Sequence, residues 1–314
     1  MTKKPNPFDA VLVIAFGGPE KIEDIRPFLT KVTQGRVPAE RLENVARHYE
    51  LFGGKSPVKE ITFRQAEALR ATLEKRDMPL PVYVGMRNWH PFLTDTVRRM
   101  SQDGVKRAVG VIMSVYQSRS SWGQYQADVA NAIAETGVDL SVSYTQPLFD
   151  QGGFIQTVSN RVRECLEKAP EPDRKEAHIL FTAHSLPYSD PQVELYAKQV
   201  HASATLVSNN LNHADWQLAY QSRSGRPQDP WLEPDINDVL RNLQSRRVKH
   251  AIAVPIGFVC DNIEVLYDLD VEAKETATQA GITLLRAKTV NDDQVFVNGL
   301  ADMVTRAAEM PKMS

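Results

Sequence analysis

Cysteine is scarce in this chain of 314 residues, which contains only Cys165 and Cys260. Two thiols cannot build a disulfide scaffold, a four-cysteine zinc site or a four-cysteine iron–sulfur cluster. Neither sign of charge dominates, because 37 Lys and Arg residues stand against 39 Asp and Glu residues, for a formal net charge of −2. A protein that grips a nucleic acid by its phosphates is more basic than this. We therefore expect no nucleic-acid partner.

Long apolar runs are also missing. The first apolar run ends at about Phe16, so it is too short and too interrupted for a signal peptide or a membrane-spanning helix. The motifs GxGxxG, GxxxxGKS/T, HExxH and GxSxG do not occur, which disfavours a nucleotide-dependent enzyme. We expect a cytoplasmic protein, and peripheral contact with a membrane is left open.

Short apolar runs alternate along the chain with longer amphipathic stretches. The runs cover residues 10–16, 82–84, 108–115, 140–144, 177–181, 217–220, 251–254 and 283–285. Such runs suit strands buried on both faces of a parallel sheet, and the stretches between them suit crossover helices. The fold class we predict is α/β, with two doubly wound parallel-sheet (Rossmann-like) domains, 1–148 and 149–314. The pattern leaves open which of the two domains the last helix packs on.

Polar, aromatic, glycine and proline residues follow the C-terminal ends of these predicted strands, as in Phe16-Gly17-Gly18-Pro19. In open α/β sheets the ligand binds at that edge. Two such edges facing each other would form one deep cleft.

His184 directly follows the apolar run 179–183, and Ser185-Leu186-Pro187 then turns the chain. A histidine at the floor of a cleft serves as a base or a metal ligand. A histidine that only bonds a loop carbonyl would be structural. Position alone favours neither interpretation.

An acidic pattern lies in the segment 255–272. Asp261 is placed to cap a helix, and Glu264, Asp268 and Glu272 then recur at every fourth residue, on one helix face. A solvated acidic face is the commoner explanation for such a pattern. However, no Lys or Arg balances the triplet at the i+4 positions within it, and like charges at this spacing destabilise a helix. A row of oxygen ligands would be a path for a hydrated divalent cation.

Seven segments of the chain, taken in order, resemble the ferrochelatase family. They are Leu12–Pro19, Phe52–Pro57, Val84–Phe92, Phe181–Pro187, Tyr220–Gly225, Pro230–Pro234 and Pro255–Glu272. The resemblance spans nearly the whole chain and implies two α/β domains with a porphyrin in the cleft between them. It also implies insertion of Fe²⁺ into a free-base porphyrin to make a haem. Porphyrin and Fe²⁺ would then be substrates, and we expect no permanently bound cofactor.

The same resemblance assigns roles to individual residues. His184 and Glu264 match the active-site pair, and Asp268 and Glu272 match acidic positions that line a metal route, so all four are candidate metal ligands. We expect His184 and Glu264 to face each other near the ring centre, one accepting pyrrole protons and the other presenting the metal. Which residue does which is left open. The residues expected to contact the porphyrin are Phe16, Arg47, Ser56, Arg87, Tyr116, Trp122, Trp231 and Phe258.

Two positions depart from the family pattern. Phe16 stands where members have Tyr, Met or Leu, and a phenyl ring can pack on a porphyrin face but cannot ligate iron. Asn262 stands where many members have His, which removes one potential proton carrier.

The polar segment 35–55, which includes Arg41, Arg47 and Lys55, favours coproporphyrin III over protoporphyrin IX. Coproporphyrin carries four propionates and protoporphyrin two. The segment 35–55 is expected at the entrance of the cleft, and a membrane-associated protoporphyrin enzyme would have more apolar residues there. Two alternatives remain open. A non-catalytic porphyrin or haem carrier would have no use for the acidic row, and a chelatase for another tetrapyrrole or metal would share the fold.

Overall fold

The structure is a computed structural model that describes residues 6–309 apart from 36, 225 and 227. By its contacts the chain forms two compact units. Unit 1 comprises Met1–Met113, Trp122–Gln146 and Asp292–Ser314, and unit 2 comprises Ser114–Ser121 and Pro147–Asn291. The expected domains 1–148 and 149–314 stay a prediction.

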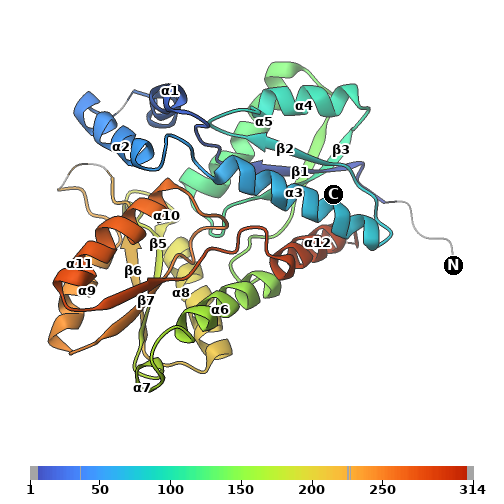
Figure 1. Cartoon of the computed structure of the whole chain (residues 1–314). Helices are drawn as coiled ribbons and strands as arrows, with labels where there is room; N and C mark the ends of the chain where they lie inside the picture. Colours follow the sequence, from blue (N-terminus) through green and yellow to red (C-terminus); the bar gives the residue numbers. More distant parts are fainter. Residues whose placement is uncertain (1–5, 36, 225, 227, 310–314) are drawn as a thin grey trace. The chain divides into compact units, whose positions relative to one another are not determined.

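Unit 1 holds a parallel sheet with the strand order β2-β1-β3-β4 (Figure 1). Its strands are β1 (Ala10–Ala15), β2 (Val82–Met86), β3 (Arg107–Ile112) and β4 (Ser141–Tyr144). Its helices are α1 (Ile22–Thr33), α2 (Ala39–Leu51), α3 (Val58–Lys75), α4 (Leu93–Gln102), α5 (Gln124–Thr136) and α12 (Gln294–Glu309). Helices α4 and α5 pack on one face of the sheet, and α3 and α12 contact its strands from the other.

Unit 2 holds a second parallel sheet, with the order β6-β5-β7-β8. Its strands are β5 (His178–His184), β6 (Trp216–Gln221), β7 (His250–Val254) and β8 (Thr283–Arg286). Its helices are α6 (Gly152–Leu166), α7 (Glu171–Arg174), α8 (Val193–Leu211), α9 (Ile236–Ser245), α10 (Ile263–Tyr267) and α11 (Lys274–Gln279). Two π-helical segments, η1 (Arg119–Gly123) and η2 (Asp268–Ala273), precede α5 and α11. Helices α9 and α11 and segment η2 share one buried cluster with the sheet.

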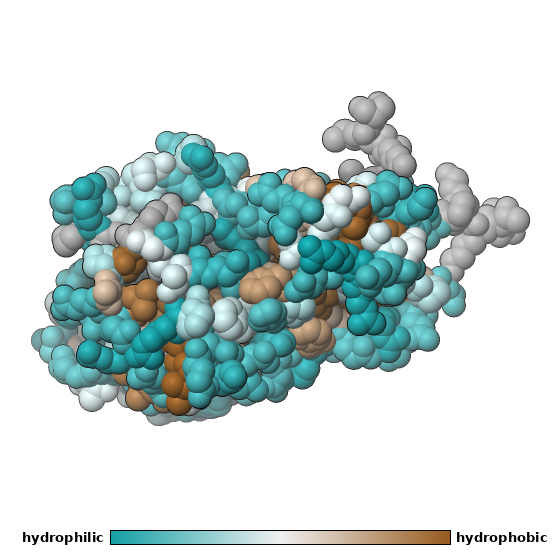
Figure 2. Space-filling model, turned by 90° about the horizontal axis from the view of Figure 1, so that it is seen from above, coloured by the Kyte–Doolittle hydropathy of each residue, from teal (hydrophilic) through white to brown (hydrophobic). Residues whose placement is uncertain are grey.

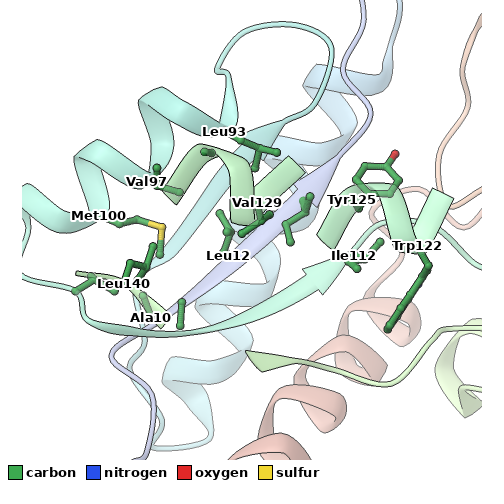
Figure 3. Close-up of a cluster of buried hydrophobic side chains, with 14 residues drawn as sticks. Ala10, Leu12, Leu93, Val97, Met100, Ile112, Trp122, Tyr125, Val129 and Leu140 are labelled. Carbon is green, nitrogen blue, oxygen red and sulfur yellow. The ribbon is translucent and has the colours of Figure 1, made fainter. Parts of the chain in front are cut away.

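Strand β1 shows why these segments read as continuous apolar runs. All six of its residues are buried, and successive side chains of a strand point to opposite faces. A strand covered by helices on both faces therefore needs an apolar residue at every position. Leu12 and Ile14 pack beneath α4 and α5 (Figure 3). The helices contribute to this cluster Leu93, Val97, Met100, Tyr125 and Val129.

All eight predicted apolar runs overlap strands of the structure, so the two parallel sheets are confirmed. The sequence predicts one helix that carries Glu264, Asp268 and Glu272, and this is wrong in detail, because α10, η2 and α11 follow one another there. Helix α2 lies in the polar segment 35–55 and buries only Ala46 among its described residues. Leu42, Val45 and Tyr49 of this helix are partly buried and pack against the cluster that contains Ala46.

The last helix, α12, packs against α3 in unit 1 (Figure 1). Arg76 pairs with Asp302 at 2.7 Å, and the Nε2 of Gln294 donates to the Oγ1 of Thr72 at 3.1 Å. These contacts place the last helix on unit 1, a point that the pattern of the sequence left open.

Among the described residues, none of the helices combines the length and the apolar character needed to cross a membrane. On the face shown in Figure 2, hydrophilic residues predominate and hydrophobic residues gather in small groups. Exposed apolar residues of this kind are ordinary on a globular protein.

Gly257 lies in the turn after β7, against the backbone of β5. A Cβ atom at this position would lie 2.9 Å from both the Cα and the Cβ of Ala183, the neighbour of His184. We therefore expect Gly257→Ala to lower the free energy of unfolding by about 1–3 kcal/mol. Gly152→Ala is the matched control, because nothing lies within 4 Å of its added Cβ, and it should change this free energy by less than about 0.5 kcal/mol. Urea unfolding measures both, and equal values for the two variants would contradict the close approach at Gly257.

Candidate active site

Three neighbouring strands of unit 2 end around one point. Strand β5 ends at His184 and β6 ends at Gln221, and the register of this pair makes the two residues neighbours. Strand β7, on the other side of β5, ends at Val254 and is followed by the turn that leads to α10. Because parallel strands present their carboxyl ends at one edge, the polar residues that follow them are brought together.

The imidazole of His184 is held in one tautomer. Its Nδ1 lies 2.5 Å from the main-chain oxygen of Ser185. A carbonyl oxygen only accepts, so Nδ1 carries the proton and donates it to this bond. The hydroxyl of Tyr196 donates to the main-chain oxygen of His184 at 2.8 Å and fixes the backbone. In the neutral ring the other nitrogen, Nε2, is left with a lone pair that can accept a proton.

Glu264 supplies the group that this nitrogen faces. Its Oε1 lies 4.0 Å from His184 Nε2, and 32% of the His184 side chain and 51% of the Glu264 side chain are exposed. The distance exceeds that of a direct hydrogen bond. A lone pair opposite a carboxylate oxygen is repulsive until a proton or a cation lies between them. The pair is therefore arranged to take up a positive species.

Asn262, and not Asp261 as we predicted, caps helix α10. The side-chain oxygen of Asn262 accepts from the main-chain N–H of Val265 at 2.9 Å, as an N-cap residue does. Asp261 instead pairs with Arg286 at 3.0 Å and accepts from the hydroxyl of Thr289 at 3.1 Å. The prediction failed because these two partners lie far along the chain and come to Asp261 only in the folded unit.

The acidic row crosses a change of helix type. Glu264 lies in α10, whereas Asp268 and Glu272 lie in the π-helical segment η2. Hydrogen bonds in a π-helix run between residues five apart, so each turn holds more residues than in an α-helix. Arg286 pairs with Asp270 at 2.7 Å and anchors this segment. Such π-helical segments occur frequently at functional sites.

Asp268 is the electrostatic centre of the row. The pKa of its carboxyl is raised from 3.8 to about 7, chiefly because the group is buried and in smaller part because of the negative charges of Glu264 and Glu272. A hydrogen bond from the hydroxyl of Ser222 opposes the rise. Loss of hydration, together with the charge of Asp235, also raises the pKa of Glu272. Carboxyl groups in this state exchange their protons for a divalent cation when one is offered.

The row is extended rather than closed into a cage. Across the part of the chain that the structure describes, no group of three or more His, Cys, Asp or Glu side chains is arranged to hold a metal ion. A cavity of about 190 Å³ lies beside the strand ends, and its lining includes Ser185, Tyr220 and Asp235.

Five of the residues expected to contact a porphyrin lie in unit 1. Phe16 follows β1 with 39% of its surface exposed, and its ring meets Phe28 edge to face. Arg47 is exposed on α2, whereas Ser56 is buried. The exposed ring of Phe16 and the guanidinium of Arg47 can both reach a ligand, and their role stays a prediction.

Arg87 and Trp122 are the other two expected porphyrin contacts in unit 1. Arg87 pairs with Asp128 at 2.6 Å and lies over the ring of Tyr125. Trp122 is buried in the cluster of Figure 3, and its indole nitrogen has no hydrogen-bond partner among the described residues. Their assignment to a porphyrin also stays a prediction.

The remaining three expected contacts lie in unit 2. Tyr116 is 2% exposed, and its hydroxyl donates to the main-chain oxygen of Ile256 at 3.1 Å. Trp231 and Phe258 are half-buried, and Phe258 packs against the cluster beneath α9. Tyr116 is thus tied into the core of its unit, and no contact of these three with a porphyrin is tested.

Gln221 and Ser222 are the residues of this site that sequence reasoning did not single out. The sequence signals them in two ways, because they follow the apolar run 217–220 and lie in the segment Tyr220–Gly225 that resembles the ferrochelatase family. That β6 lies beside β5 depends on the order of strands in the sheet, which the chain's own order does not reveal.

Asp268 generates a testable pH dependence. Its pKa in the folded protein is about 7, above the value of about 3.9 for an unfolded chain, so the folded state binds the proton more tightly. The stability that this group contributes is therefore full below about pH 4 and is lost as the pH rises through 7. We expect Asp268→Asn to flatten the free energy of unfolding over this range, measured in urea without added metal. The carboxyl titration of Asp268 by NMR should move to lower pH in Glu264→Gln, and a wild-type midpoint near pH 4 would contradict the prediction.

Residues 8–308 match the family model described as Ferrochelatase. A coproporphyrin III ferrochelatase of Mycobacteroides abscessus is 41% identical over 307 residues, which cover 96% of this chain and 89% of the relative. Proteins of the same name from Mycobacterium ulcerans and Streptomyces coelicolor are 44% and 40% identical. They cover 92% and 96% of this chain, and 84% and 86% of the relatives.

Solved structures agree with the fold. The sirohydrochlorin chelatase SirB of Bacillus subtilis subspecies spizizenii, solved in complex with cobalt, superposes with a TM-score of 0.60 over 96% of each chain at 12% identity. CbiX, described as the terminal enzyme of sirohaem biosynthesis in denitrifying bacteria, gives 0.55 over 95% of this chain and 99% of its own, also at 12% identity. At this identity the likeness concerns the fold alone. The family match and the identity to the relatives extend over most of the sequence, and the chain therefore belongs to the ferrochelatase family.

Proposed function

We propose that this protein inserts Fe²⁺ into coproporphyrin III in haem biosynthesis, as a metal-inserting lyase. The observation that carries the proposal is the opposition of His184 Nε2 and Glu264 Oε1 at 4.0 Å, at the carboxyl edge of a parallel sheet. Membership of the ferrochelatase family supports the reaction. The names of the relatives support the choice of porphyrin.

The reaction makes two demands on the protein. A free-base porphyrin must lose two pyrrole N–H protons, and the hydrated cation must lose water before four nitrogens bind it. The products are the metallated ring and two protons. The site therefore needs a proton acceptor and a negatively charged group for the cation, both close to the ring centre.

His184 is the proton acceptor in this proposal. Its Nδ1–H is committed to the main-chain oxygen of Ser185, so Nε2 offers its lone pair toward the space shared with Glu264. A neutral imidazole is suited to take a proton near pH 7. The tautomer thus supports one of the two assignments that the sequence left open.

Glu264 presents the metal. It stands at the head of the row that continues through Asp268 and Glu272. Carboxylate oxygens hold divalent iron while water leaves, and geometry and ligand type discriminate only weakly among first-row divalent cations. Zn²⁺ is for this reason expected to be inserted as well.

Among the eight residues named from the sequence as porphyrin contacts, those that are exposed or half-buried are the candidates for binding the macrocycle. We propose that Phe16, Trp231 and Phe258 pack on the ring and that Arg47 pairs with a propionate. A planar ring hides its nitrogen lone pairs, and contacts remote from the centre can bend it at a cost of about 1–5 kcal/mol. We propose no permanently bound cofactor, no nucleic-acid partner and a cytoplasmic location, and the proposal leaves peripheral membrane contact open.

Removing either member of the pair tests the mechanism. We expect His184→Ala and Glu264→Gln each to lower kcat for Fe²⁺ insertion by at least about 100-fold, the lower range for lost acid–base catalysis. His201→Ala, on the exposed surface of α8, is the matched control and should keep wild-type turnover. Anaerobic insertion followed by absorbance measures all three. Near-wild-type rates in both site variants would remove this mechanism, and haem binding without insertion by the wild type would favour a carrier.

The choice of porphyrin is tested by offering both substrates under the same conditions. We expect kcat/KM for coproporphyrin III to exceed that for protoporphyrin IX by at least about tenfold. Protoporphyrin lacks two of the propionates, so protein groups that pair with them in coproporphyrin would have no partner. A polar site discriminates strongly against a substrate that lacks a group the site is built to bind. Equal or higher kcat/KM for protoporphyrin would overturn the assignment.

A further inference from the structure

The side-chain amide of Gln221 is buried at the junction of the acidic row and the His184–Glu264 pair. Only 1% of Gln221 is exposed. Its Nε2 donates to Asp268 Oδ2 at 3.3 Å and to the main-chain oxygen of Glu264 at 3.4 Å. The register of β5 and β6 pairs Gln221 with His184. Gln221 therefore bonds the carboxylate of Asp268 and the backbone of Glu264, and it lies beside His184 in the sheet.

The orientation of this amide follows from its neighbours. The two atoms that one end of the amide faces, a carboxylate oxygen and a carbonyl oxygen, are both acceptors. The nitrogen must lie at that end, because an oxygen there would donate nothing to either. The other end is the oxygen Oε1, which is buried and accepts no hydrogen bond from the residues that the structure describes.

A buried oxygen without a donor is unusual in a folded protein. The large majority of buried polar side-chain atoms have a partner, and each exception needs a cause. The neighbouring residue reinforces the point, since Ser222 adopts a φ of 59°, a left-handed conformation uncommon for residues other than glycine. Its hydroxyl donates to the same carboxylate, Asp268. The end of β6 is thus shaped around Asp268 while one of its own acceptors is left unused.

We propose that Gln221 Oε1 binds the divalent cation, directly or through one of its waters, on its way from Asp268 to the His184–Glu264 pair. An amide oxygen is a hard ligand of the kind that hydrated divalent cations accept. The positively charged cation would then be the partner of Oε1. Gln221 then acts twice: Nε2 positions Asp268, and Oε1 touches the metal substrate.

A neutral ligand has a physical advantage at this position. Glu264, Asp268 and Glu272 already offer three carboxyl groups, and an approaching cation favours their negatively charged forms. A further carboxylate would hold the cation more strongly and slow its transfer, whereas an amide oxygen fills a coordination position without adding charge.

The experiment uses the full chain and Fe²⁺ alone. This inference rests on the proposed function, so the wild type is first tested for Fe²⁺ insertion into coproporphyrin, and failure there would overturn that function while leaving the metal titration interpretable. Gln221→Met keeps the side-chain length and removes the amide. Gln217→Met, on the same face of β6 four residues earlier, is the matched control. Anaerobic calorimetry without porphyrin measures the Kd for Fe²⁺ in both variants, each also made in an Asp268→Ala background.

We expect Gln221→Met to raise the Kd for Fe²⁺ by about tenfold or more, in both backgrounds, and Gln217→Met to leave it unchanged. In turnover, the KM for Fe²⁺ should rise while the KM for coproporphyrin stays constant. An unchanged Kd would overturn the proposal. So would a loss that disappears in the Asp268→Ala background, because Gln221 would then act only by holding Asp268. If thermal unfolding shows that Gln221→Met does not fold, Gln221→Asn replaces it, since its side chain is one methylene shorter. This variant must raise the Kd for Fe²⁺ to the same extent.

Discussion

The site depends on one arrangement, in which His184 Nε2 faces a carboxylate oxygen of Glu264 4.0 Å away. Two groups that both seek a positive charge gain nothing from each other alone. They are held in place by bonds made elsewhere, through Nδ1 to the oxygen of Ser185 and through the Asn262 cap of α10. The surrounding fold therefore maintains a geometry that becomes favourable only when a proton or a metal arrives.

The acidic row extends the same principle along η2. Neighbouring carboxylates on one helix face destabilise that helix, and their charges add to the effect of burial in raising the pKa of Asp268. Arg286 offsets this destabilisation from outside the row, because it pairs with Asp261 before α10 and with Asp270 inside η2. Its side chain is only 14% exposed, so these ion pairs are less screened than those at the surface. Local rules of helix stability are broken here, as they commonly are at functional sites.

Individual residues show how far sequence reasoning reaches. His184, Glu264, Asp268 and Glu272 could be singled out, because a histidine after an apolar strand and carboxylates at a fixed spacing are local patterns. The cap of α10 was placed one residue too early, because Asp261 pairs with the distant Arg286. The change to a π-helix was also missed, since the spacing of the carboxylates suited a single α-helix. Gln221 escaped notice because its importance lies in its neighbours across the sheet.

The sequence by itself determined the two parallel sheets and the strand ends that carry polar residues, because hydrophobic periodicity and turn residues act over short distances. It also indicated the family through ordered local segments. Only the tertiary structure decided which strand ends are neighbours, which unit α12 packs on, and that His184 Nε2 and Glu264 Oε1 face each other. Those relations join residues that are far apart in the chain, and they arise from packing and sheet order, which no local pattern encodes.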